Sequence, residues 1–184
     1  MNASHFFDHV RSKYGDLDQA QVNGFNAVLA ACEGAPLAHA AYMLATAWHE
    51  TNRTMQPVRE AYWLSETWRK THLRYYPHYG RGYVQLTWEI NYDHADAKLG
   101  LQGALIANPD LAMNSEIAAK IMRRGMDEGW FTGVKNSDVL PTRGTATREQ
   151  YMNGRTMING HDKADLIEDY AQVFERGLIE GAWE

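Results

Sequence analysis

Two glutamates and a later polar segment have the residue types that hydrolysis of a glycosidic bond requires. Such hydrolysis uses two carboxyl groups, one protonated to assist the leaving oxygen and one ionised to activate water. Glu50 ends an apolar run that begins at Leu37, so a helix over this run would place its carboxyl at the negative end of the helix dipole. Burial and the dipole would both favour the protonated, acidic form. An ordinary solvated glutamate at a helix end fits the same local sequence at least as well.

The second carboxylate has two candidates before the next polar segment, Glu60 and Glu66. Glu60 lies in the irregular stretch 58–61, where a turn would fold it back across a groove. Glu66 lies in a helical pattern, where it has an ion-pair partner four residues on in Lys70. We therefore take Glu60 as the expected general base.

The segment Tyr83–Thr87 has the alternation and β-branched content of a strand, and it predicts a small hairpin or three-stranded sheet. On such a strand Gln85 and Thr87 point to one face, where an amide and a hydroxyl would hold a water or a sugar hydroxyl. Thr87 also fits as the N-cap of a helix starting at Trp88, and the two roles are compatible.

Aromatic residues are concentrated in the middle of the chain, and carbohydrate grooves use such rings as stacking platforms. Each ring taken singly also fits a position in the core or at its rim. They are Tyr62, Trp63, Trp68, Tyr75, Tyr76, Tyr79, Tyr83, Trp88 and Tyr92.

A metal site is not expected. The pair His49-Glu50 has the beginning of the zinc-protease motif, which needs a second histidine three residues after the glutamate. Position 53 is arginine, and the eight histidines show no ligand spacing. We expect no cofactor either.

Helical periodicity dominates the rest of the chain and predicts a mainly α-helical fold. Asp16 with Gln19 has the form of a capping box before a first helix that ends at Gly34. The stretch 132–144 has no periodicity and carries glycines and a proline, so it is expected to be a surface loop. The other expected helices are 37–50, 62–73, 88–99, 115–130 with Ser115 as N-cap, and 162–178.

Composition indicates one globular domain over residues 1–184, because 45% of the residues are hydrophobic and no linker-like stretch interrupts them. The net charge of -5 disfavours a nucleic-acid partner, although a local basic patch around Arg69, Lys70, Arg74 and Arg81 remains compatible with an anionic wall polymer. Cys32 lies among apolar residues and is expected to be a buried, reduced thiol. The start of the chain lacks the apolar stretch of a signal peptide. We therefore expect a monomer made in the cytoplasm, without membrane insertion.

Five segments in order resemble glycoside hydrolase family 19, which contains chitinases and phage endolysins with a lysozyme-like α-helical fold. The Tyr79–Thr87 segment, YGRGYVQLT, is the most specific, because nine consecutive residues agree in type with the family's Y-G-R-G-x-I-Q-L-T/S. The other four segments are Ala47–Thr51 (AWHET), Asn91-Tyr92, Asn108–Leu111 (NPDL) and Ile158–Gly160 (ING).

The resemblance implies that Glu50 is the general acid, that Thr87 helps to position the attacking water, and that the anomeric carbon is inverted. Inversion requires the two carboxyl groups to lie about 6.5–9.5 Å apart, so that a water fits between them. The resemblance and the expected aromatic groove together imply that seven residues bind the substrate. They are His49, Tyr79, Arg81, Gln85, Trp88, Asn91 and Asn159.

Three departures from the family pattern limit this transfer. The stretch after Glu50 is short and free of cysteines, position 161 is histidine where a second glycine is usual, and the arginine of the family's last helix has no counterpart near Leu166. Short, cysteine-free members most resemble bacterial and phage lysozymes. The expected substrate is therefore bacterial peptidoglycan, reached in the cell wall after release, or in the host cell if the protein is phage-encoded. The alternatives are a chitinase and an inactive amino-sugar-binding module.

Overall fold

The computed structural model describes all residues 1–184 and is mainly α-helical. Ten α-helices and two short 3-10 helices accompany a two-stranded antiparallel sheet. The first half contains α1 (Ala3–Tyr14), α2 (Gln19–Ala31), α3 (Leu37–Glu50), β1 (Val58–Arg59), α4 (Glu66–His72), β2 (Arg81–Gly82) and α5 (Glu89–Leu99). The second half contains α6 (Ala104–Ala107), η1 (Pro109–Met113), α7 (Ser115–Glu128), α8 (Asn136–Val139), α9 (Arg148–Gly154), η2 (Arg155–Met157) and α10 (Ala164–Glu180).

Helix α3 forms the centre of the fold because its sequence is apolar on nearly every side. Its residues from Ala38 to Trp48 are all buried, as expected for a helix surrounded by others. The predicted bounds, Leu37 to Glu50, are confirmed. Helix α10 packs along α3, α1 packs on α10, and α2 packs on α7. Because α3 is fixed in this way, the position of Glu50 at its end is fixed too.

Several predicted helix ends differ from the structure. The capping box uses Asp18 and Gln21 rather than Asp16 and Gln19, and Asn114 rather than Ser115 caps α7. The helix expected over 62–73 is confined to α4, and the helices α1 and α9 were not predicted. The expected loop 132–144 contains the short helix α8.

The expected strand at Tyr83–Thr87 is wrong. Strand β2 is Arg81–Gly82, it pairs with β1, and the chain then turns back so that Arg81 bridges to Leu86. Gly82 and Gln85 have φ angles of 89° and 52°, which a continuing strand does not allow. The apolar alternation arises instead because Tyr83, Val84 and Leu86 are buried as parts of a compact turn.

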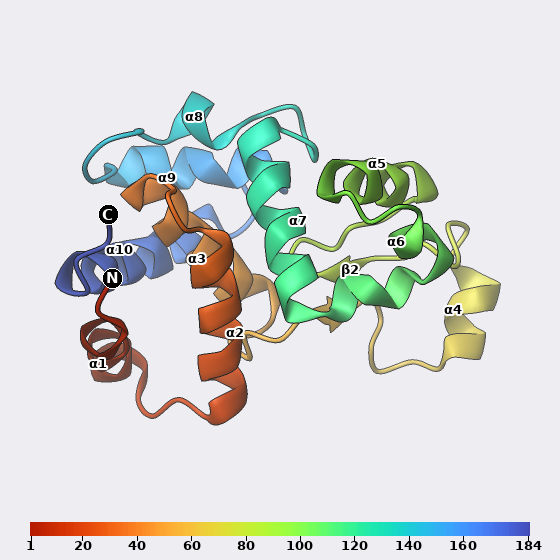
Figure 1. The fold of residues 1–184 in the computed structure, drawn as a ribbon, viewed down its shortest axis with the longest axis horizontal. Helices are drawn as coiled ribbons and strands as arrows, with labels where there is room; N and C mark the ends of the chain where they lie inside the picture. Colours follow the sequence, from red (N-terminus) through yellow and green to blue (C-terminus); the bar gives the residue numbers. More distant parts are fainter.

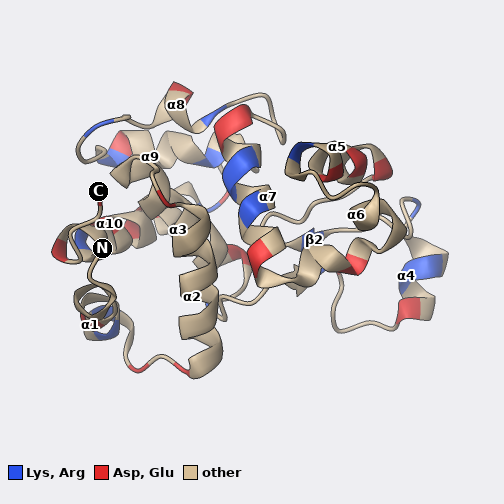
Figure 2. Cartoon of the chain, viewed as in Figure 1, with Lys and Arg blue, Asp and Glu red and all other residues tan.

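Two groups of elements lie on either side of α7 (Figure 1). One contains α1, α2, α3, α9 and α10, with both chain ends close together, and the other contains α4, α5, α6 and the sheet. Figure 2 shows α2 free of charged residues, whereas α4 and α7 carry both signs. The segment from Glu50 to β1 connects the two groups.

Cys32 is a free, fully buried thiol, as predicted, and its Sγ lies 3.8 Å from Met43 Sδ. Burial raises the pKa of this thiol to about 12, so it stays protonated and unreactive at neutral pH. None of the helices combines the length and the apolar character needed to cross a bilayer.

Candidate active site

Glu50 is held by Arg155, a residue that no sequence pattern indicated. Arg155 Nη1 donates to Glu50 Oε1 at 2.6 Å, and Arg155 Nε donates to the carbonyl oxygen of Asp162 at 2.9 Å. The Arg155 side chain is 2% exposed and the Glu50 side chain 21% exposed. This ion pair fixes the orientation of the Glu50 carboxyl group at the end of α3.

The loop after Glu50 is fixed by its own side chains and by α2. Thr51 Oγ1 donates to the carbonyl oxygen of Ala47 at 2.7 Å and accepts from the Met55 N–H at 2.9 Å. On the other side Gly24 of α2 touches this loop, since a β-carbon on Gly24 would lie 1.8 Å from the Met55 carbonyl oxygen. The Thr-based turn and the missing side chain at Gly24 together bring the loop against α2.

Glu60 is held at both carboxylate oxygens. Tyr75 donates its hydroxyl to Oε1 at 2.6 Å, and the Gly80 N–H donates to Oε2 at 2.9 Å. The Glu60 N–H also donates to the Gly80 carbonyl oxygen at 2.7 Å, which continues the pairing of β1 with β2. The hydrogen bond to Glu60 raises the pKa of Tyr75 to about 12, so Tyr75 remains a donor over the whole physiological range.

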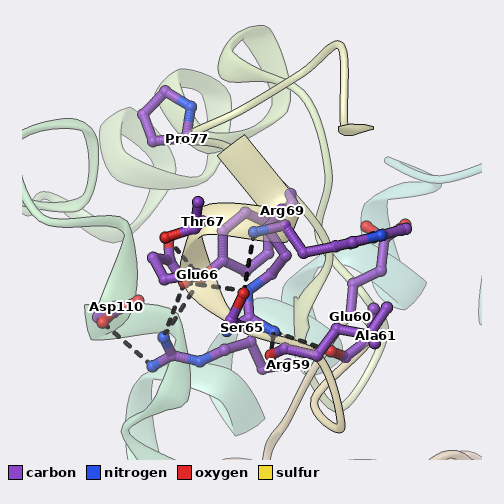
Figure 3. A network of polar contacts seen from close by, with 12 residues as sticks. Arg59, Glu60, Ala61, Ser65, Glu66, Thr67, Arg69, Pro77 and Asp110 are labelled. Carbon is purple, nitrogen blue, oxygen red and sulfur yellow. Dashed lines mark hydrogen bonds and ion pairs between the residues drawn. The ribbon is translucent and has the colours of Figure 1, made fainter. Parts of the chain in front are cut away.

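Glu66 lies in a separate ion-pair network. It accepts from Arg69 Nε at 2.9 Å rather than pairing with Lys70, and the Tyr79 hydroxyl donates to it at 3.0 Å. Figure 3 shows Arg59 reaching towards Glu66 on one side and Asp110 on the other. Burial alone would raise the pKa of Glu66, but the bonds from Arg69 and Tyr79 outweigh it and lower the pKa. Glu66 therefore acts in the structure as an ion-pair partner.

Gln85 and Thr87 approach Glu60 even though they are not on a strand. A β-carbon placed on Gly80 would lie 2.7 Å from Gln85 Oε1, 3.2 Å from Glu60 Oε2 and 3.3 Å from Thr87 Oγ1. Gln85 Nε2 donates to the Val58 carbonyl oxygen at 3.0 Å, which leaves Oε1 on the Gly80 side. Thr87 Oγ1 donates to the Gln85 carbonyl oxygen at 2.8 Å and does not cap α5. Three side-chain oxygens thus surround one glycine.

A pocket of about 500 Å³ contains both candidate carboxylates, Glu50 and Glu60, together with Gln85. Its apolar wall includes Tyr62 and Trp63, whose exposed fractions of 69% and 72% are the highest of the large aromatic side chains. Exposed rings beside paired carboxylates are typical of a carbohydrate groove. Glu66 does not line this pocket.

The larger hollow, of about 870 Å³, lies between α1 and α10. Its lining is charged and polar apart from Val173, and its carboxylates do not face an apolar wall. No three His, Cys, Asp or Glu side chains come together in an arrangement that could hold a metal ion. The pocket with Glu50 and Glu60 is therefore the better candidate site.

Tyr79 and Arg81, expected to bind substrate, are 0% and 3% exposed and do not line the pocket. The Arg81 guanidinium lies 3.6 Å from the centre of the Tyr79 ring, and its Nε donates to Asp110 at 2.8 Å. It also donates to the Tyr92 hydroxyl at 3.1 Å. These contacts hold the segment that carries Gly80 in place.

His49 and Trp88 also lie outside the pocket. His49 is half-buried beside the Tyr170 ring, and burial lowers its pKa although Glu50 acts in the opposite direction. Its imidazole is therefore neutral at neutral pH. Trp88 is 41% exposed, and its ring packs edge-to-face with the ring of Tyr75, the residue that binds Glu60.

Asn91 and Asn159 are exposed and reach the site residues through the backbone. Asn91 Nδ2 donates to the Thr87 carbonyl oxygen at 2.8 Å, and the Asn159 N–H donates to the Arg155 carbonyl oxygen at 3.0 Å. Both residues thus contact the backbone of Thr87 and Arg155 without lining the pocket.

Backbone strain is concentrated around the pocket. Non-glycine residues rarely adopt a positive φ, and in folded proteins such residues cluster at functional sites. Between residues 52 and 88 the structure has positive φ angles at Asn52, Arg53, Met55, Ala61, Gln85 and Trp88. Three of these positions, Asn52, Ala61 and Gln85, line the pocket.

Arg155 and Tyr75 are the two contact residues that sequence reasoning did not identify. Arg155 is 105 positions from Glu50 in a 3-10 helix without periodicity, so no local pattern indicates the pair. Tyr75 was one of nine aromatic residues named as possible stacking platforms, and nothing in the sequence indicated its contact with Glu60.

Comparison of the chain with known protein families, curated proteins and solved structures gave no match.

Proposed function

We propose that this protein is a glycoside hydrolase that cleaves β-1,4 bonds of bacterial peptidoglycan by an inverting acid/base mechanism. The observation that carries the proposal is the pocket in which Glu50 and Glu60 lie together beside exposed aromatic rings. Two carboxyl groups facing one cavity are the minimum equipment for this reaction.

The surroundings of the two carboxyl groups suit different roles. Both oxygens of Glu60 accept hydrogen bonds, from Tyr75 and Gly80, which hold the carboxyl group in one orientation, as a general base requires. Glu50 has only Oε1 engaged, by Arg155. A protonated Glu50 keeps that contact through its carbonyl oxygen, and Oε2 remains available to pass a proton to the leaving oxygen.

Gln85 and Thr87 suit the positioning of the attacking water. Their side-chain oxygens lie around Gly80 together with Glu60 Oε2, so a water that reaches this point meets several acceptors at once. An inverting mechanism needs such a water between base and anomeric carbon, on the face opposite to the acid.

The five ordered sequence segments support assignment to glycoside hydrolase family 19 with a lysozyme-like fold. A mainly helical chain with a small sheet beside the pocket is compatible with that fold. In the proposed enzyme α3 supplies the acid, Glu50, and segment 79–87 supplies Gly80, Gln85 and Thr87 around the base, Glu60. We place its substrate in the bacterial cell wall, as for an endolysin.

The experiment compares wild type with Glu50→Gln and Glu60→Gln on purified peptidoglycan and on chitin oligomers, by release of new reducing ends. Each substitution should lower kcat by about 10²–10⁴-fold, the range for loss of a general acid or base. Glu149→Gln is the matched control, because Glu149 is exposed, does not line the pocket and has no ion-pair partner. Product anomers and label from isotopic water identify the cleaved bond and test inversion.

The competing functions give different outcomes in the same experiment. Turnover of chitin oligomers without any action on peptidoglycan would favour a chitinase. Binding of either polymer without turnover by the wild type would indicate an inactive amino-sugar-binding module. Unchanged activity in both glutamate variants would refute the assignment of the site.

A further inference from the structure

Arg74 is a cation without an ion-pair partner in a chain whose net charge is -5. It lies two residues after the end of α4 and is exposed. Its guanidinium is 4.9 Å from the centre of the Trp88 ring, which is a cation–π distance. The ring restricts the side chain while the donor edge of the guanidinium stays free for a ligand.

A run of contacts connects Arg74 with the catalytic machinery. The Trp88 ring packs against Tyr75 with ring centres 5.0 Å apart, and Tyr75 donates to Glu60 at 2.6 Å. Trp88 has a strained φ of 75°, and its N–H donates to the His78 carbonyl oxygen at 2.8 Å, so its position is fixed by the backbone. Tyr75 and the exposed Trp88 ring therefore connect Glu60 with an unpaired positive charge.

Four other arginines near the pocket are paired with carboxylates of the protein, and Arg53, which has no ion pair, donates to the Tyr170 hydroxyl at 3.0 Å. Arg59 and Arg81 bind Asp110, Arg69 binds Glu66, and Arg155 binds Glu50. A ligand carboxylate gains little from an arginine that is already paired. The sequence analysis named three arginines as a local basic patch, Arg69, Arg74 and Arg81. Among these three, only Arg74 has no carboxylate partner and so offers a free guanidinium edge.

We propose that Arg74 binds a carboxylate carried by the glycan while a sugar ring of the same chain contacts Trp88. This rests on the proposed function and names its substrate class, an amino-sugar polymer with acidic substituents rather than a neutral one. The carboxylate belongs either to the lactyl group of the sugar or to a peptide attached to it. An exposed charged pair of this kind changes affinity by about two- to fivefold, and a bidentate arginine contact increases the effect.

The test measures kcat and KM for wild type, Arg74→Gln and Arg143→Gln. Arg143 is an exposed arginine in the loop between α8 and α9, far from α4 in Figure 1, so its replacement makes the same charge change at a remote place. Three polymers are used: peptide-free alternating glycan strands with free lactyl carboxylates, the same strands with these groups converted to methylamides, and intact peptidoglycan.

Arg74→Gln should raise KM about fivefold on a carboxylate-bearing polymer, with kcat nearly unchanged, and should have no effect on the methylamide strands. The loss should shrink as salt is added, because screening weakens an exposed charge contact. A loss on the free-carboxylate strands identifies the lactyl group as the ligand, and a loss on intact peptidoglycan alone identifies the peptide. An equal loss on the neutral strands, or the same loss in Arg143→Gln, would overturn the proposal.

Binding to the same strands is measured separately by calorimetry, so that this inference and the proposed function fail in different ways. Binding that Arg74→Gln weakens, without any cleavage by the wild type, would refute the hydrolase and support the carboxylate site. Cleavage by the wild type with no preference for charged strands would refute the carboxylate site and leave the hydrolase intact.

Discussion

Replacing Gly80 by alanine disturbs the proposed water site without deleting any of its groups. The new β-carbon would lie 2.7 Å from Gln85 Oε1, 3.2 Å from Glu60 Oε2 and 3.3 Å from Thr87 Oγ1. Contacts below 3.0 Å are not tolerated, so Gln85 must move, whereas Glu60 and Thr87 need to shift by only a few tenths of an ångström. The φ of Gly80 is not in the left-handed region, so the backbone itself accepts alanine.

The cost in stability should be small because the closest atom belongs to the end of a flexible side chain. We expect about 1 kcal/mol, the low end of the range for overpacking a well-filled site. The cost in activity should be larger, because an error of about 1 Å in a catalytic constellation lowers the rate by about 100-fold. Gly80→Ala should therefore lose most of its kcat while remaining folded.

The assay combines urea unfolding with initial rates on purified peptidoglycan. Gly177→Ala is the matched control, because a β-carbon there would approach Phe6 at 3.2 Å in the packing of α10 on α1, far from the pocket. It should change stability by a similar small amount and leave the rate unchanged. Adding Gln85→Ala to Gly80→Ala removes the clash but also the hydrogen bond from Gln85 Nε2 to the Val58 carbonyl oxygen, so the double variant should regain neither full stability nor activity.

Two results would contradict this reasoning. Wild-type activity in Gly80→Ala would mean that the three oxygens around Gly80 do not position a reactant. Complete unfolding would mean that the glycine is needed for packing of the sheet rather than for the arrangement of Gln85.

Three further perturbations test other contacts. Arg155→Met leaves the partly buried Glu50 without a partner and should lower the free energy of unfolding, measured in urea, by about 2–3 kcal/mol. The loss is smaller than for a fully buried pair because the Glu50 side chain is 21% exposed. An unchanged midpoint of urea unfolding would refute the importance of the pair. Tyr75→Phe removes one donor to Glu60 and should lower kcat about tenfold with KM retained; a change in KM alone would place Tyr75 in substrate binding. Hydrogen bonds from Lys98, Trp130 and Arg124 lower the pKa of Glu128 from 4.5 to about 2. The ionised form of Glu128 therefore stabilises the fold fully above pH 4.5, and this stabilisation is lost as the pH falls towards 2. Unfolding curves for wild type and Glu128→Gln should accordingly converge over that range, and parallel curves would contradict the assigned shift.

The sequence predicts the helices well where apolar periodicity is strong. The bounds of α3 follow from an uninterrupted apolar run, and α7 and α10 have clear stripes. Helix α1 was not predicted because its apolar pattern is short. Only Phe6, Phe7 and Val10 of its twelve residues are buried, and the residues around them are mostly charged or polar. Its place is set by packing on α10 and not by its own pattern.

The candidate site was predicted in part for the same reason. Glu50, Glu60 and Gln85 line one pocket, but only Glu50 ends an element with a clear apolar pattern; Glu60 follows a two-residue strand and Gln85 lies in the turn after β2. The alternation at Tyr83–Thr87 indicated a strand because burial of every apolar side chain in a tight turn produces the same pattern. Arg155 could not be found, because an ion pair across 105 residues is a property of the folded chain alone.

The contact between Gly24 and Met55 makes the loop after Glu50 depend on a helix that contributes no residue to the pocket. Any side chain on Gly24 would collide with the main chain of the loop, and main chain cannot rotate aside. The N-terminal helices are therefore not an independent appendage that can be trimmed to leave a smaller working core. Libraries of variants built to alter specificity in the pocket need to keep position 24 as glycine. A choice of positions based on pocket lining alone would overlook it, because Gly24 does not line the pocket.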